Sequence, residues 1–146
     1  MKKLLLILLC LPIIGFGQFF EQTWYYSNTS GGRSVQQTSD GGFIITGSGK
    51  STTATGNPNV FLKKTDGNGI EQWSYDFGNA NLFQSGCSVQ QTTDGGYIIA
   101  GVTTDIAFGP YVVLLIKTDG SGTEQWTKTL AGISSQGGYS VQQTTD

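Results

Sequence analysis

Two unrelated phrases recur along this chain with a common period. The phrase SVQQT starts at Ser34, Ser88 and Ser140, at spacings of 54 and 52 residues. The phrases KTDGNGIEQW (64–73) and KTDGSGTEQW (117–126) lie 53 residues apart. Because both phrases keep one period, the sequence predicts repeated structural units, each of which buries its apolar surface against its neighbours.

Each repeat predicts four short β-strands that are joined by glycine-rich turns. The strands are expected at 35–38, 43–46, 60–63 and 71–77 in the first repeat, and at 89–92, 97–100, 111–117 and 124–130 in the second. The first two strands of each repeat are separated by Asp40-Gly41-Gly42 or Asp94-Gly95-Gly96. Asp-Gly is a strong hairpin signal, because a type I′ turn needs positive φ at both central residues. The repeats therefore span 34–77 and 88–130, and a third begins at Ser140 with a strand at 141–144.

The middle strands of each repeat are continuous apolar runs, FII and VFL in the first repeat and YII and YVVLLI in the second. A continuous run indicates burial on both faces, which a sheet between two like sheets provides. We therefore predict an all-β chain of four-stranded antiparallel blades of the β-propeller type. A β-solenoid is the alternative, although its period is usually about 20–30 residues. Because a closed propeller has about 4–8 blades, residues 18–146 are expected to be a fragment, with further blades in a C-terminal part.

The first 17 residues have the pattern of a secretory signal peptide. Lys2 and Lys3 precede an apolar run at 4–14, and Gly15-Phe16-Gly17 places small residues before the expected cleavage site. This predicts a secreted or cell-surface protein without membrane insertion after cleavage. A lipoprotein signal with Cys10 as the lipidated residue is the alternative, but leucine, not a small residue, precedes Cys10.

Charge and composition exclude several classes of function. Loss of Lys2 and Lys3 takes the net charge from −2 to −4, whereas a nucleic-acid-binding protein normally has a basic patch. The chain contains no histidine, which excludes Ser-His-Asp and Cys-His nucleophiles and the usual histidine-containing zinc sites from it. No catalytic residue, cofactor site or strong metal site is predicted.

One tryptophan recurs in every unit, at Trp24, Trp73 and Trp126. An exposed indole can stack on a sugar ring, but a residue that every unit requires is more typical of structure. We therefore interpret the three tryptophans as plugs between neighbouring sheets, and Asp40, Gly41, Gly42, Asp94, Gly95 and Gly96 as structural turn residues.

Two repeated turns place oxygen-bearing side chains at alternate positions, as calcium loops do. The candidate ligands are Asp66, Asn68, Glu71, Asp119, Ser121 and Glu124. The competing interpretation is a hairpin turn whose aspartate accepts hydrogen bonds from backbone N–H groups. We favour the turn, and keep weak calcium binding as the alternative.

Glutamine pairs and a single cysteine lie at the start of the repeats. The pairs are Gln36-Gln37, Gln90-Gln91 and Gln142-Gln143. If the first strands line a central channel, these amides form a ring that binds a polar ligand or only holds water. Cys87 aligns with Arg33 and Tyr139, which predicts a partly buried position and an unreactive thiol.

The phrase SVQQTTDGGYIIAG, followed by LLIKTDGSGTEQW, resembles the repeats of large secreted bacterial β-propeller proteins. Many of these carry a C-terminal sorting domain for type nine secretion, and their repeats are distantly similar to quinoprotein-type propellers, bulb-type lectins and endoglucanase-associated proteins. The resemblance covers residues 19–146. It implies a propeller scaffold, but acidic residues often found before SVQQT in those repeats are absent here at 78–87 and 131–139.

The loops that differ between the repeats are where we expect function to lie. These are 47–59 and 102–110, and the segments that precede each first strand. They are rich in Asn, Ser, Thr, Phe and Tyr, which suits neutral polar ligands such as glycans. The sequence predicts a secreted, non-catalytic scaffold that binds polysaccharide or a surface glycan. The alternative is the propeller portion of a polysaccharide-degrading enzyme or of a quinoprotein relative.

Overall fold

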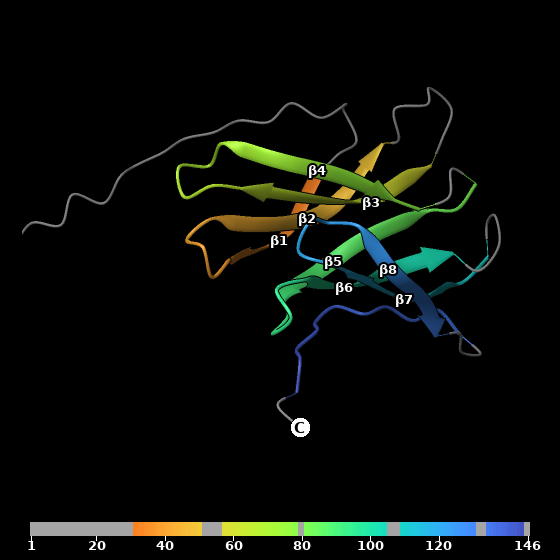
Figure 1. Cartoon of the computed structure of the whole chain (residues 1–146). Coiled ribbons are helices and arrows are strands. Elements are labelled where there is room, and N and C mark those ends of the chain that lie inside the picture. Colours follow the sequence, from red (N-terminus) through yellow and green to blue (C-terminus); the bar gives the residue numbers. More distant parts are fainter. Residues whose placement is uncertain (1–30, 51–56, 79–80, 105–108, 131–133, 145–146) are drawn as a thin grey trace, which may run out of the picture.

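The computed structural model describes residues 31–50, 57–78, 81–104, 109–130 and 134–144 (Figure 1). The predicted signal peptide at 1–17, with Cys10, and the first repeated tryptophan, Trp24, lie outside the described residues.

Eight strands form two four-stranded antiparallel sheets, which we call sheet A and sheet B (Figure 1). Sheet A consists of β1 (Gly31–Gln37), β2 (Phe43–Lys50), β3 (Pro58–Thr65) and β4 (Glu71–Phe77), in that order. Sheet B consists of β5 (Gln84–Gln91), β6 (Tyr97–Thr104), β7 (Tyr111–Thr118) and β8 (Glu124–Leu130), also in that order. The part of the chain that the structure describes contains no helix. The all-β prediction is thus confirmed, as is the grouping of each repeat into one antiparallel sheet.

The turn between the first two strands differs from the predicted type I′ turn. Gly41 N donates to Thr38 O at 2.9 Å, and Thr38 N donates to Gly42 O at 2.9 Å. The central residues of the turn are therefore Ser39 and Asp40, and Gly41 follows with φ 83°. Asp40 causes the difference, because its carboxylate accepts hydrogen bonds from Thr38 Oγ1 and Gly42 N. The second repeat has the same turn, with Gly95 at φ 82°.

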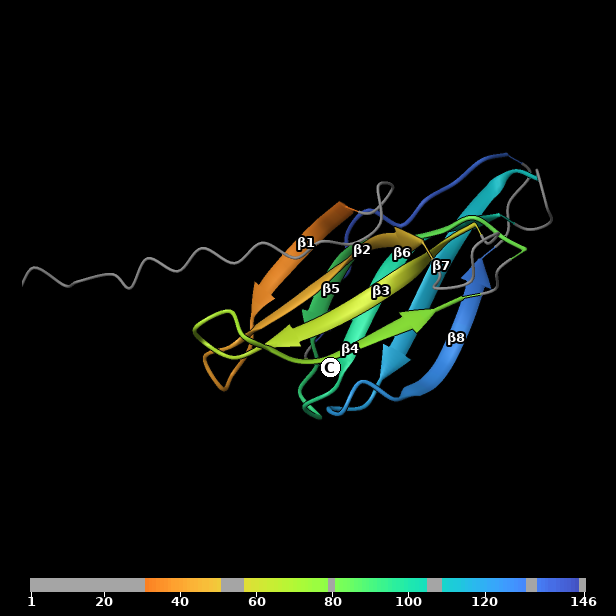
Figure 2. The same cartoon turned by 90° about the horizontal axis from the view of Figure 1, so that it is seen from above.

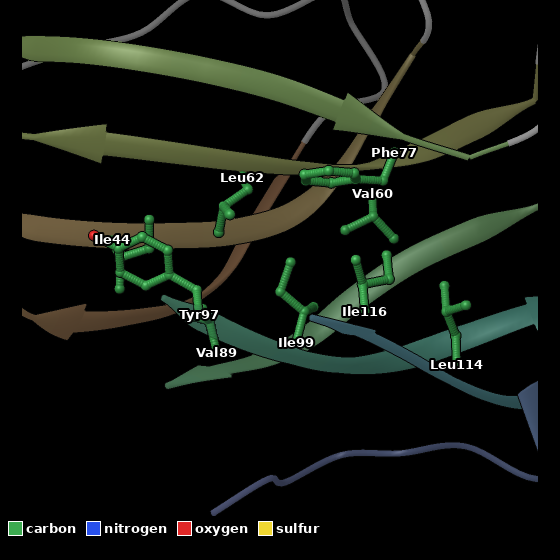
Figure 3. Close-up of a cluster of buried hydrophobic side chains, with 9 residues drawn as sticks. All are labelled: Ile44, Val60, Leu62, Phe77, Val89, Tyr97, Ile99, Leu114 and Ile116. Atoms are coloured by element: carbon green, nitrogen blue, oxygen red, sulfur yellow. The ribbon is translucent and has the colours of Figure 1, made fainter. Parts of the chain in front are cut away.

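The two sheets stack face to face, and the hydrophobic core lies between them (Figures 1 and 2). Strand β5 is the strand of sheet B that contacts sheet A most broadly, since it packs against β1, β2 and β3. Figure 3 shows the core side chains, which come from both sheets: Ile44, Val60, Leu62, Phe77, Val89, Tyr97, Ile99, Leu114 and Ile116.

Strand β6 of sheet B is buried on both faces. Tyr97 and Ile99 point toward sheet A and are 2% and 1% exposed. Ile98 and Ala100 point the other way, because side chains alternate along a strand, and they are also buried. Segment 134–144 lies along this second face, where Gly138 N donates to Gly101 O at 3.1 Å (Figure 1). The runs YII on β6 and VFL on β3 therefore have the double burial that the sequence predicts, whereas FII on β2 and the run on β7 after Tyr111 alternate between buried and half-buried residues.

The strand predicted at 141–144 is not observed. Val141 N donates to Ser88 Oγ and Gln143 N donates to Gln90 Oε1, so these main-chain groups bond to side chains of β5. Within the described residues no strand pairs with this segment. A β-strand requires main-chain partners on a neighbouring strand, which explains why the segment is extended without belonging to a sheet.

Candidate functional site

Trp73 lies between the two sheets. It projects from β4 of sheet A, and its ring lies 5.8 Å from the ring of Tyr97 on β6 and 5.7 Å from that of Tyr75. On the other side is Gly122, which has φ 86°. A Cβ added at Gly122 would lie 2.8 Å from the indole, so only glycine leaves room for it. Trp73 is thus half-buried between the sheets, with Tyr97 and Gly122 on either side of its indole.

Trp126 holds the same position in sheet B but has no third sheet over it among the described residues. It is 38% exposed and borders an open hollow of about 410 Å³. Asp94, Lys117 and Gln143 also line this hollow, and Lys128 Nζ lies 5.3 Å from the ring centroid. Because Trp126 is the repeat counterpart of Trp73, this hollow corresponds to the place where a following sheet would pack.

The glutamine pairs connect one repeat to the next. Gln91 N donates to Gln36 Oε1 at 2.6 Å, and Ser39 N donates to Gln91 Oε1 at 2.8 Å. The bonds run in both directions, so each repeat satisfies a main-chain donor of the other. Gln143 N donates to Gln90 Oε1 at 2.7 Å, and Thr93 N donates to Gln143 Oε1 at 2.8 Å, which reproduces the pattern one repeat later.

These four glutamines (Gln36, Gln90, Gln91 and Gln143) thus hold neighbouring units in register. Sequence reasoning proposed only a ring of amides that holds water or a ligand. The signal that could have revealed their role was the SVQQT phrase itself, because a side-chain amide that recurs in every unit can bond to the main chain of the same phrase in the next unit.

A buried lysine meets the turn aspartate in each repeat. Lys64 Nζ lies 2.8 Å from Asp40 Oδ2, and also donates to Thr65 O at 2.8 Å and to Gln72 Oε1 at 3.1 Å. Its side chain is 4% exposed, so its charge is largely removed from water. In the second repeat Lys117 Nζ lies 2.9 Å from Asp94 Oδ2. These ion pairs fasten the first turn of each sheet to its third strand.

The hydrogen bonds at each turn lower the pKa of its aspartate far below the usual range. For Asp40 the main cause is the hydrogen bond from Lys64, followed by those from Thr38 and Gly42. For Asp94 the main cause is the hydrogen bond from Thr92, followed by that from Lys117. Both carboxylates are therefore ionised throughout the physiological range, and neither has the raised pKa of a general acid.

The candidate calcium ligands are used by the turns in which they lie. Asp66 Oδ1 accepts hydrogen bonds from Asn68 N at 2.9 Å and Ile70 N at 2.8 Å. Asp119 Oδ1 accepts hydrogen bonds from Ser121 N and Thr123 N, both at 2.9 Å. The pKa of Asp119 is lowered, mainly by the hydrogen bond from the Ser121 hydroxyl.

The glutamates of these turns do not join the aspartates. Glu71 pairs with Lys63, and Glu124 is exposed at the start of β8. Among the described residues no three Asp, Glu, Cys or His side chains are grouped so that they could hold a metal ion.

Cys87 is half-buried on β5, but its repeat counterparts are not in similar slots. Arg33 is exposed and Tyr139 is 75% exposed, so the common slot predicted from the alignment is wrong. The difference follows from the stacking, since β5 lies between β1 and segment 140–144, whereas the other two positions lie on outer faces. Burial raises the pKa of the Cys87 thiol, which disfavours the reactive thiolate.

The non-repeated segments of sheet B come together at one end of the sheet. Phe83 precedes β5 and Tyr111 begins β7, and their rings meet edge to face at 5.6 Å. Thr104 ties the first segment to β6, because Thr104 N donates to Phe83 O at 3.0 Å. Gln136 N donates to Tyr111 O at 2.7 Å and brings in the segment that follows β8. Tyr111 is 43% exposed, and its counterpart in sheet A is Pro58, so this aromatic pair is not a repeated feature.

Comparison with known proteins assigns no family to the chain. No family model matches it, and no curated protein matches it either. In the described part of the chain there is also no helix with the length and apolarity needed to cross a bilayer.

Proposed function

We propose that this chain is part of a secreted β-propeller-type scaffold whose non-repeated loops bind polysaccharide or a surface glycan. Support for the blade arrangement comes from the bonds between repeats. Segment 140–144 bonds to β5 through Gln90 and Gln143 in the way that β5 bonds to β1 through Gln36 and Gln91. An interface that recurs in the same register allows further units to be added in the same direction.

The binding proposal rests on one observation, the convergence of Phe83 and Tyr111 at the loop end of sheet B. The repeated polar residues at the turns and along the first strands are engaged within the scaffold. Tyr111, in contrast, is exposed and is not repeated. An exposed aromatic ring offers the apolar face on which a neutral sugar packs, and the loop sequences contain Asn, Ser and Thr as hydrogen-bonding groups.

Binding to a panel of plant, fungal and bacterial polysaccharides tests this proposal. We expect the complete-length protein to bind at least one glycan, and Tyr111→Ala to weaken that binding at least tenfold while leaving the thermal unfolding midpoint nearly unchanged. Tyr139→Ala is the matched control, because Tyr139 is 75% exposed and lies outside the aromatic pair. Absence of binding across the panel, or equal loss in both variants, contradicts the proposal.

A further inference from the structure

Sheet A has an apolar groove on the face that points away from sheet B. The groove has a volume of about 480 Å³. Its lining includes Val35, Phe43, Ile45, Thr65 and Gly69. These residues lie on β1, β2, β3 and the turn after β3. The corresponding elements of sheet B, which are β5, β6, β7 and the turn after β7, pack against sheet A.

The corner formed by Phe43 and Gly69 corresponds residue by residue to the place in sheet B that holds Trp73. Phe43 is paired with Thr65 in sheet A as Tyr97 is paired with Thr118 in sheet B. Gly69 has φ 78° and Gly122 has φ 86°. Both glycines are buried, and each follows an aspartate turn with the same bond back to that aspartate.

Sheet B shows what such a corner holds. The indole of Trp73 contacts Tyr97 on one side and approaches the glycine on the other, where a Cβ would come within 2.8 Å. The space between the Tyr97 ring and Gly122 therefore fits a flat indole. The equivalent corner of sheet A therefore has the shape for a tryptophan from a strand on its outer side.

We propose that this corner binds Trp24 of the same chain. Trp24 follows Glu21-Gln22 after one inserted residue, and Tyr26 lies two residues beyond it, as Tyr75 lies two residues beyond Trp73. It lies seven residues before Gly31, where β1 begins, and seven extended residues span at most about 25 Å. A chain leaving β1 can therefore reach back along the groove to this corner.

Two side chains on the outer face of sheet A are buried, which supports the proposal that another segment covers this face. Phe61 and Lys63 alternate with Val60 and Leu62 along β3, and Val60 and Leu62 point toward sheet B. Phe61 and Lys63 thus point away from sheet B, yet they are only 6% and 4% exposed. Chain outside sheets A and B is needed to cover them, and the Trp24 segment is the one that carries the matching tryptophan. The inference extends the blade stacking proposed above and is independent of glycan binding.

Fluorine NMR of the full chain labelled with 5-fluorotryptophan tests the inference. Single Trp→Phe variants assign the three resonances, and Trp73 and Trp126 serve as internal standards for a half-buried and an exposed indole. We expect the solvent isotope shift of Trp24 to be close to that of Trp73 and at least twofold smaller than that of Trp126. We expect Phe43→Ala to move only the Trp24 resonance, and Tyr97→Ala to move Trp73 but not Trp24.

Val35→Ala is the control within the groove, because Val35 lies on β1, outside the proposed corner, and is 62% exposed. An unchanged Trp73 resonance verifies that Phe43→Ala and Val35→Ala are folded, and an unchanged Trp126 resonance does so for Tyr97→Ala. A Trp24 resonance as exposed as that of Trp126, or one that does not move in folded Phe43→Ala, overturns the inference. So does a concentration-dependent shift of Trp126 that disappears in Phe43→Ala, because it would identify a second copy as the occupant. A variant that loses glycan binding while its Trp24 resonance is unchanged separates the two proposals. So does a variant whose Trp24 resonance moves while glycan binding is retained.

Discussion

The two sheets carry nearly the same repeated residues, but those residues have different surroundings. Trp73 of sheet A is half-buried against sheet B, whereas Trp126 of sheet B is 38% exposed. The difference is reversed on the first strands, where Val89 is 5% exposed and its counterpart Val35 is 62% exposed. The same residue types are thus buried on the faces that meet and exposed on the faces that do not.

Under the proposed blade arrangement, a further sheet on each side would bury the copies that are exposed here. Each sheet has a tryptophan on one face and a corner formed by an aromatic ring and a glycine on the other. The corner is Phe43 and Gly69 in sheet A, and Tyr97 and Gly122 in sheet B. Where one face meets the other, as between sheets A and B, the hydrophobic core forms (Figures 2 and 3). The stability of the repeat therefore depends on its neighbour as well as on its own residues.

The comparison is tested most strongly by removing the two tryptophans in turn. We expect Trp73→Ala to lower the free energy of unfolding by about 3 kcal/mol, because it leaves a cavity between the sheets. Trp126→Ala should cost about 1 kcal/mol or less, as is usual for a surface position. Urea denaturation measures both values. Equal costs in the two variants would show that the interface between the sheets is not what stabilises them.

The next largest difference is expected for the turn aspartates. Asp40→Asn should lower the free energy of unfolding by about 1–3 kcal/mol, because it removes the carboxylate that compensates a buried ammonium. Asp94→Asn should have a smaller effect, since Lys117 is 12% exposed against 4% for Lys64. Chemical denaturation at neutral pH compares the two. A larger effect at Asp94 would contradict the ordering by burial.

The lowered pKa of Asp40 also gives a pH dependence with a definite sign. A carboxylate whose pKa is lower in the folded state stabilises the fold fully above its unfolded pKa of about 3.9, and this contribution is lost as the pH falls toward the folded value. The wild-type chain should therefore lose stability below about pH 4, and Asp40→Asn should lose less over the same interval. Parallel acid-unfolding curves would show that Asp40 is not a source of acid sensitivity.

The smallest difference is expected for the glutamines. Gln36→Ala should cost about 1 kcal/mol, because it removes the acceptor for Gln91 N at the interface between the sheets. Gln90→Ala should cost less, because its donor, Gln143 N, belongs to an exposed residue in a segment without strand partners. Amide hydrogen exchange at Gln91 provides the local measurement, and exchange that Gln36→Ala does not accelerate would rule out the inter-repeat bond.

Sequence analysis predicted the strands well but not the details that depend on contacts between repeats. The apolar runs and Asp-Gly turns located all eight strands, since alternation and turn chemistry are local properties. The predicted bounds were too short for β1, β2, β3, β5 and β6, and the further strand predicted at 141–144 is not observed. The type I′ turn was wrong, because the bonds of Asp40 to Thr38 and Gly42 decide the turn. The shared slot for Cys87, Arg33 and Tyr139 was also wrong, because an alignment contains no information on which copy is enclosed.

The candidate site was predictable in part. The segments that differ between repeats were identified from the sequence, although 47–50, 58–59 and 102–104 of the predicted loops belong to strands. The meeting of Phe83 and Tyr111 was not predicted. These residues are far apart along the chain and belong to different loops, and only the pairing of β5, β6 and β7 brings them to one end of sheet B.

The period of the sequence, its apolar runs and its turn glycines by themselves determined that the chain forms four-stranded antiparallel sheets of like construction. Which tryptophan is enclosed, which glutamine bonds to which strand and which aromatic rings face the solvent were decided only by the stacking of sheet A on sheet B. The physical reason is that strand formation depends on local hydrogen bonding and side-chain alternation, whereas burial depends on what lies across the interface, and identical repeats cannot encode their own position in the stack.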